Sequence, residues 1–176
     1  MERIGSRRVH EGRLSTVRVD EFRYADGSVS EREVVAHPGA VAVVAHDERY
    51  LYLVRQPREA VGEERLLELP AGKLDVEGES PLQAAKRELG EEVGRTAARW
   101  RELKRFYSSP GFTDEEVWVF LATDLSDSSA EQDAEERIEI VLHPLEELDG
   151  AIDECADAKS LVGLLLFRDM RRSGEE

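Results

Sequence analysis

One short segment, from Ser80 to Gly94, combines the signals that begin, hold and end a helix. Ser80 is a favoured N-cap residue, and Gln83 three residues later completes a capping box. Pro81 falls at the first helical position, where its missing N–H costs nothing. Gly94 is the residue type that most readily adopts the left-handed conformation in which helices end. The apolar residues recur on one helix face: Leu82, Ala85, Leu89 and Val93. The segment therefore predicts one helix that packs on a core.

Three glutamates, Glu88, Glu91 and Glu92, lie within two turns of this helix. Residues four apart share a face, with Cβ atoms about 5–6 Å apart, so Glu88 and Glu92 repel each other unless a cation lies between them. Mg²⁺ prefers oxygen ligands, keeps several waters and is usually completed by substrate phosphates. The spacing therefore indicates a divalent-metal site facing a phosphorylated substrate. Arg87 can pair with Glu91 at i,i+4. From these residues alone, a solvated acidic helix face is the alternative.

Composition limits the class of partner. The 176 residues carry a net charge of −15, which suits one soluble globular domain. Such a surface argues against nucleic acid or an anionic membrane as a partner. No apolar run approaches the roughly 18 residues of a membrane span, and the first residues lack an apolar signal core. A cytoplasmic protein is expected by default, and the single cysteine, Cys155, is expected to be a packed residue.

Beyond the helix, short apolar segments alternate with polar turns. The expected strands are residues 14–24, 28–37, 40–45, 50–56, 66–69, 100–107, 117–122 and 138–142. Two further short helices are expected at residues 144–149 and 160–171, and an acidic loop at residues 124–136. Many strands with two or three helices indicate an α+β fold in which helices pack on a mixed sheet.

The segment from Gly72 to Gly94 resembles the Nudix box, in which a glycine and a glutamate precede the pattern Arg-Glu-aliphatic-x-Glu-Glu-x-Gly. Here six residues separate Gly72 from Glu79 where the family has five, and Arg95 stands at the final aliphatic position. An extra loop residue is tolerated thermodynamically. The resemblance implies a Nudix α/β/α sandwich with a mixed sheet, plus a small N-terminal β-hairpin or sheet.

The same resemblance implies a metal-dependent chemistry. Mg²⁺ is the expected ion, with Mn²⁺ possible. Its ligands would be Glu88, Glu92 and the carbonyl of Ala71. Glu91 would assist catalysis, and Arg87 would orient the acids.

Other segments narrow the resemblance to ADP-ribose pyrophosphatases: residues 32–35, 37–43, 54–58, 68–74, 109–115 and 157–160. The implied reaction converts ADP-ribose, or a related nucleoside diphosphate sugar, to AMP and ribose 5-phosphate. One alternative is another nucleotide substrate, such as NADH, GDP-mannose or oxidised dGTP. The other is a non-catalytic nucleotide-sensing module, which the intact box glutamates disfavour.

Four residues outside the box are candidates for substrate binding. Arg32 and Arg58 offer planar donor forks suited to phosphate or to stacking on adenine. Phe112, next to Gly111, can pack on a base or ribose, and Glu115 can accept hydrogen bonds from ribose or adenine. The alternatives are solvated arginines and a core phenylalanine.

The catalytic base is expected on a loop before a late strand, as in similar enzymes. Glu136 is the first candidate and Glu135 the second. The family often shows an acid-x-acid spacing at this point, where this chain has Ala134-Glu135-Glu136, so both stay candidates.

The chain is expected to divide into an N-terminal β-hairpin region, residues 1–37, and a Nudix hydrolase domain, residues 38–176. A two-stranded hairpin is marginal in water unless it packs on something. The resemblance implies that it pairs across a twofold axis, giving a homodimer in which Arg32 reaches the neighbouring site. A surface hairpin on a monomer is the alternative.

Overall fold

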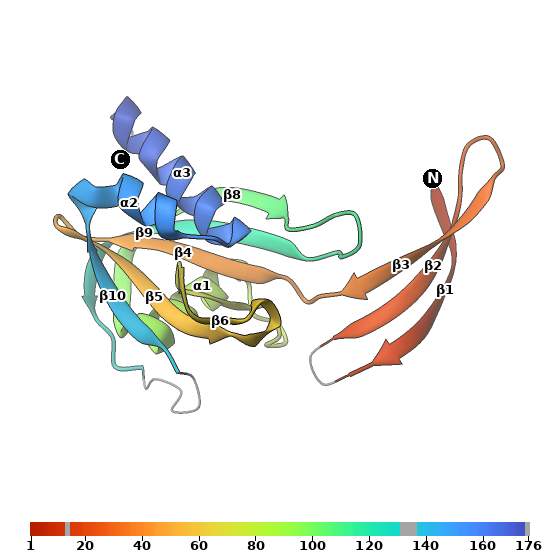
Figure 1. The fold of residues 1–176 in the computed structure, drawn as a ribbon, viewed down its shortest axis with the longest axis horizontal. Coiled ribbons are helices and arrows are strands. Elements are labelled where there is room, and N and C mark those ends of the chain that lie inside the picture. The colour runs from red at the N-terminus through yellow and green to blue at the C-terminus, as the bar shows by residue number, and fades with distance from the viewer. Residues whose placement is uncertain (13–14, 131–136, 175–176) are drawn as a thin grey trace. The chain divides into compact units, whose positions relative to one another are not determined.

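The computed structural model describes residues 1–12, 15–130 and 137–174. These residues form two compact units, coloured by residue number in Figure 1. The first comprises Met1–Gly39 with Phe106–Glu116, and the second Ala40–Arg105 with Val117–Glu176.

The first unit contains a three-stranded antiparallel sheet in the order β1-β2-β3 (Figure 1). The strands are β1 (Glu2–Glu11), β2 (Thr16–Arg23) and β3 (Val29–Ala36). Gly27, with φ of 83°, adopts the left-handed conformation in the β2–β3 turn, as the expected hairpin requires. The expected hairpin corresponds to β2 and β3, and the observed sheet has β1 as a third strand. Strand β1 was not predicted, because nearly all its side chains are exposed and show no apolar alternation.

The second unit is built on a mixed sheet in the order β10-β5-β4-β9-β8, with β6 paired to β5 and β7 to β4. Strands β4 and β9 run parallel, whereas β5 runs antiparallel to β4, β6 and β10. The strand bounds are β4 (Ala40–His46), β5 (Tyr50–Arg58), β6 (Glu63–Glu68), β7 (Ala71–Lys73), β8 (Arg95–Tyr107), β9 (Glu116–Asp127) and β10 (Glu139–Pro144). The mixed sheet agrees with the expected fold class.

Two helices cover opposite faces of this sheet. Helix α1 (Pro81–Val93) packs on the face of β4 that carries Val41 and Val43. Helix α3 (Ala158–Ser173) packs on the other face, where a Cβ added at Gly163 would lie 3.1 Å from Val44. Alternate residues of one strand point to opposite faces, so the fully buried β4 is the centre of an α/β/α sandwich. The α+β prediction is confirmed.

Some element boundaries differ from those expected. Strand β9 continues to Asp127, into the polar segment that was expected to be a loop. Cross-strand ion pairs with β8 stabilise this extension: Arg99 with Asp124 and Arg95 with Asp127. Helix α2 (Leu148–Glu154) begins later than expected, after a 3-10 turn at Leu145–Glu147. Within the described ranges no helix is long and apolar enough to cross a membrane.

Candidate active site

The helix signals in the sequence correspond to observed contacts at both ends of α1. Ser80 N–H donates to Gln83 Oε1 at 2.9 Å, and Ser80 Oγ accepts from Gln83 N–H at 3.4 Å. Gly94, at φ of 68°, ends the helix, and its N–H is bonded to the last helical carbonyls. Because both ends are capped, the acidic residues of the last two turns have a fixed place on the helix.

Two of these acids are buried against the turn that precedes the helix. Glu88 is 9% exposed and Glu92 is 4% exposed. Ala71 N–H donates to Glu92 Oε2 at 2.8 Å. The Glu88 carboxylate lies so close to Gly72 that an added Cβ would be 1.8 Å from Oε1. The fold therefore brings together Ala71, Glu88 and Glu92, the three residues predicted to bind the metal, and Gly72 is required for the close approach.

Arg87 connects the acids of the box. Its Nη1 donates to Glu88 Oε1 at 2.7 Å and to Glu91 Oε2 at 2.9 Å. Its Nε and Nη2 donate to the two carboxylate oxygens of Glu79, each at 3.1 Å. The hydrogen bonds to Glu79, the charge of Glu88 and the hydrogen bonds to Glu91 and Glu88 raise the pKa of Arg87 above its ordinary value. The extra residue between Gly72 and Glu79 therefore leaves Glu79 in contact with the helix.

The donor set suits a hard divalent cation. Among residues whose placement is described, no group of three or more His, Cys, Asp or Glu side chains could hold a metal by itself. Two buried carboxylates and the Ala71 carbonyl are all oxygen donors. Mg²⁺ commonly binds through one or two carboxylates and takes its remaining oxygens from water and substrate phosphate. The residues present therefore fit such an ion when a phosphorylated substrate is bound.

Arg58 is not a solvated arginine, because its guanidinium forms two hydrogen bonds with a buried carboxylate. Its Nε and Nη2 donate to Glu68 Oε1 and Oε2 at 2.6 and 2.9 Å, and Glu68 also binds Lys159 Nζ. Burial by itself would raise the pKa of Glu68, but these two cations outweigh it and lower that pKa. The hydrogen bond with Glu68 and the charges of Glu68 and Glu92 raise the pKa of Arg58.

The sequence reasoning missed Glu68 and Lys159 as members of this cluster. The available signal was a glutamate inside the apolar run Leu66-Leu67-Glu68-Leu69. A charged residue in a buried strand is almost always paired. Asp157 also binds Lys159, at 2.9 Å. The cluster holds Arg58 at a defined place, with 40% of its side chain exposed.

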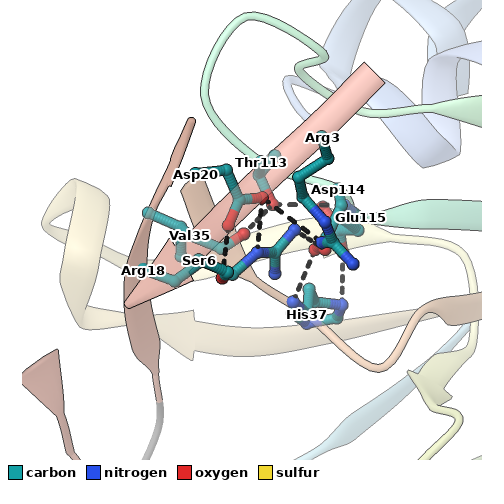
Figure 2. A network of polar contacts seen from close by, with 9 residues as sticks. All are labelled: Arg3, Ser6, Arg18, Asp20, Val35, His37, Thr113, Asp114 and Glu115. Carbon is teal, nitrogen blue, oxygen red and sulfur yellow. Dashed lines mark hydrogen bonds and ion pairs between the residues drawn. The ribbon is translucent and has the colours of Figure 1, made fainter. Parts of the chain in front are cut away.

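The other substrate-binding candidates belong to the first unit. Arg32 Nη1 donates to the carbonyl of Glu31 at 2.7 Å, and its Nη2 donates to Tyr24 Oη at 3.3 Å. Phe112 is 57% exposed, so it is not a core residue of this unit. Glu115 Oε1 lies 3.6 Å from His37 Nδ1 (Figure 2). The two candidate bases, Glu135 and Glu136, lie outside the described residues.

Comparisons of the sequence and of the fold with known proteins identify the family of this chain. Residues 36–162 match the NUDIX domain, and residues 1–35 match the nucleoside diphosphate sugar hydrolase N-terminal domain. The ADP-ribose pyrophosphatase of Bacillus subtilis (strain 168) is 40% identical over 162 residues, covering 89% of this chain and 86% of that relative.

A second relative, the ADP-ribose pyrophosphatase of Mycobacterium tuberculosis (strain ATCC 25618 / H37Rv), is 48% identical over 125 residues. That match covers 70% of this chain and 60% of the relative. The crystal structure of an ADP compounds hydrolase superposes with a TM-score of 0.84 at 26% identity, covering 99% of this chain and 96% of that one. The match to the family model spans well over half of the residues, and the chain belongs to the Nudix family.

Proposed function

We propose that this protein hydrolyses the diphosphate of ADP-ribose to AMP and ribose 5-phosphate. The observation that carries the proposal is the buried pair Glu88 and Glu92, placed against Ala71 and Gly72. Two buried carboxylates on one helix face supply the oxygen ligands through which Mg²⁺ commonly binds. Two relatives named ADP-ribose pyrophosphatase, 40% and 48% identical, support the choice of substrate.

Nudix hydrolases generally need a divalent metal ion, and Mg²⁺ is the proposed ion here, with Mn²⁺ as a substitute. Glu88, Glu92 and the Ala71 carbonyl would hold it. When bound, such an ion screens the phosphoryl oxygens and lowers the pKa of a coordinated water. Arg87 keeps the ligand Glu88 and the assisting Glu91 in place through direct hydrogen bonds.

Recognition of the nucleotide is assigned to four side chains. Arg58, held by Glu68 and with part of its side chain exposed, is proposed to bind the diphosphate. Phe112 is proposed to pack on the base or ribose, and Glu115 to accept hydrogen bonds from them. Arg32 is proposed to reach the adenosine of a neighbouring subunit.

A substrate panel tests the function. Purified protein with Mg²⁺ is incubated with ADP-ribose, ADP-glucose, GDP-mannose, NADH and oxidised dGTP, and the products are separated by chromatography. We expect AMP and ribose 5-phosphate from ADP-ribose, with the highest kcat/KM of the panel. A higher kcat/KM on another compound overturns the substrate assignment. Tight binding of ADP-ribose without any turnover would identify a nucleotide sensor instead.

Replacement of the candidate bases tests how water is activated. We expect Glu136→Gln to lower kcat by about 10²-fold, the scale of general base catalysis. The KM and the Mg²⁺ affinity should stay near wild type, because the base acts only in the transition state. Glu135→Gln is the comparison variant one residue away. If both single variants and the double variant keep full turnover, the base lies elsewhere and Glu115 becomes the next candidate.

Subunit mixing tests the proposed homodimer, formed through residues 1–37, and the donation of Arg32 across it. Deleting these residues would also remove Val35 and His37, which contact the loop that bears Phe112, so deletion cannot isolate an effect on assembly. Arg32→Ala subunits are instead mixed with Glu92→Gln subunits. If Arg32 serves the neighbouring site, each heterodimer has one complete site, and random exchange restores about a quarter of wild-type activity. Exchanged mixtures that stay inactive contradict this donation, and a monomeric wild-type protein in sedimentation contradicts the dimer.

A further inference from the structure

The loop between β8 and β9, residues 108–115, is bound to strand β3 through the backbone of Val35. Val35 N–H donates to the carbonyl of Phe112 at 2.8 Å. Val35 C=O accepts from Thr113 Oγ1 at 2.8 Å and from Asp114 N–H at 3.4 Å. Val35 and Thr113 thereby form a parallel bridge. The loop also closes on itself, because the carbonyl of Ser109 accepts from the N–H groups of Phe112 and Thr113, each at 3.1 Å.

Side chains reinforce this attachment (Figure 2). Asp114 Oδ1 accepts from His37 N–H at 2.9 Å, and Asp114 Oδ2 accepts from Arg18 Nη2 at 2.8 Å. The same guanidinium donates through Nε to Asp20 Oδ2 at 2.9 Å. Asp20 is only 2% exposed and also accepts from Ser6 Oγ at 2.6 Å. Arg18 therefore joins a buried carboxylate of the sheet to a carboxylate of the loop.

The result of this bonding is an exposed aromatic side chain on an ordered backbone. Phe112 is 57% exposed, although the N–H and C=O groups around it are hydrogen-bonded. A rigid, exposed aromatic has apolar area to bury on a ligand. It also loses little conformational entropy when a ligand binds, because its backbone is already ordered. Glu115, beside His37, follows on the same loop.

We propose that Arg18 and Asp114 are positioning residues for substrate recognition, and that the N-terminal sheet is the scaffold holding Phe112 and Glu115 ready for the nucleotide. The inference rests on the proposed function, in which these two side chains contact the nucleoside. Arg18 and Asp114 touch no substrate and act through the loop. The N-terminal sheet thus has a part in recognition through the loop that it holds, separate from any role in assembly.

Two variants break the Arg18–Asp114 pair with little change of shape. Arg18→Met removes the charge and the donors. Asp114→Asn keeps an oxygen for His37 N–H but turns an amide donor toward Arg18. The matched control is Arg23→Met on the same strand, which breaks an exposed 3.8 Å ion pair with Glu2. We expect both test variants to raise the KM for ADP-ribose about tenfold with kcat within about twofold of wild type, the pattern of lost ground-state binding. The control should match wild type.

A readout that needs no substrate accompanies the kinetics. Amide hydrogen exchange in residues 106–116 should be faster in Arg18→Met and Asp114→Asn, and unchanged in Arg23→Met. The double variant should change the KM no more than the larger single change, because both residues serve one contact. Thermal melts confirm that each variant is folded.

Hydrogen exchange and the KM together separate the attachment of the loop from its role in recognition. Unchanged exchange in both test variants overturns the attachment, and faster exchange with an unchanged KM overturns its role in recognition. A fall in kcat alone overturns positioning in favour of a part in the chemistry. If wild-type protein turns over no panel substrate, the proposed function fails, while hydrogen exchange still tests the attachment. If it prefers another nucleotide, the same KM comparison is made with that compound.

Discussion

Glu92→Gln is expected to lower kcat by at least about 10²-fold, the scale of removing one positioned charge from a transition state. Glutamine has the same shape and similar helix propensity. Its amide oxygen can still accept from Ala71 N–H, as Glu92 Oε2 does at 2.8 Å. The substitution removes the negative charge of Glu92, a residue that is 4% exposed and lies four positions from Glu88. The fold should therefore be unharmed, or slightly stabilised by relief of like-charge repulsion.

Steady-state kinetics over a range of Mg²⁺ concentrations, together with thermal melts, check this expectation. Glu146→Gln is the matched control, because Glu146 is exposed on a 3-10 turn of the same unit. It should leave both kcat and the melting temperature at wild-type values. Near-normal turnover by Glu92→Gln at saturating Mg²⁺ would remove Glu92 from the metal site.

Gly72→Ala should lower kcat/KM by about 10²-fold, the cost of misplacing a catalytic group by about 1 Å. The added Cβ would lie 1.8 Å from Glu88 Oε1 and 1.9 Å from its Cδ. The φ angle of Gly72 is not positive, so alanine strains no backbone and the collision is the whole effect. Glu88 must move, although Arg87 binds it at 2.7 Å.

Gly150→Ala is the control for this substitution, because a Cβ at Gly150 meets nothing within 4 Å and φ is not positive there. It should be active and, lying in helix α2, slightly more stable. Circular dichroism of Gly72→Ala should show a native fold. Full activity of Gly72→Ala would mean that the Glu88 carboxylate can shift without loss, and that the close approach is not needed for catalysis.

The amino-acid sequence by itself determined helix α1 and the acids on it. Capping by Ser80, the stop at Gly94 and the four-residue spacing of Glu88 and Glu92 all involve residues close together in the chain. Such signals need no knowledge of the rest of the fold. The apolar run of β4 was equally clear, because a strand buried on both faces shows no polar alternation.

Only the tertiary structure decided what lies against these elements. Strand β1 is nearly all polar, and its pairing with β2 could not be read from periodicity. Arg58 looked like a free phosphate ligand until Glu68, ten residues away, was seen to hold it. Arg18 and Asp114 are 96 residues apart, and Thr113 and Val35 are 78 apart. The physical reason is the range of the interactions: caps and helix faces depend on near neighbours, whereas ion pairs and strand pairing depend on which distant segments the fold brings together.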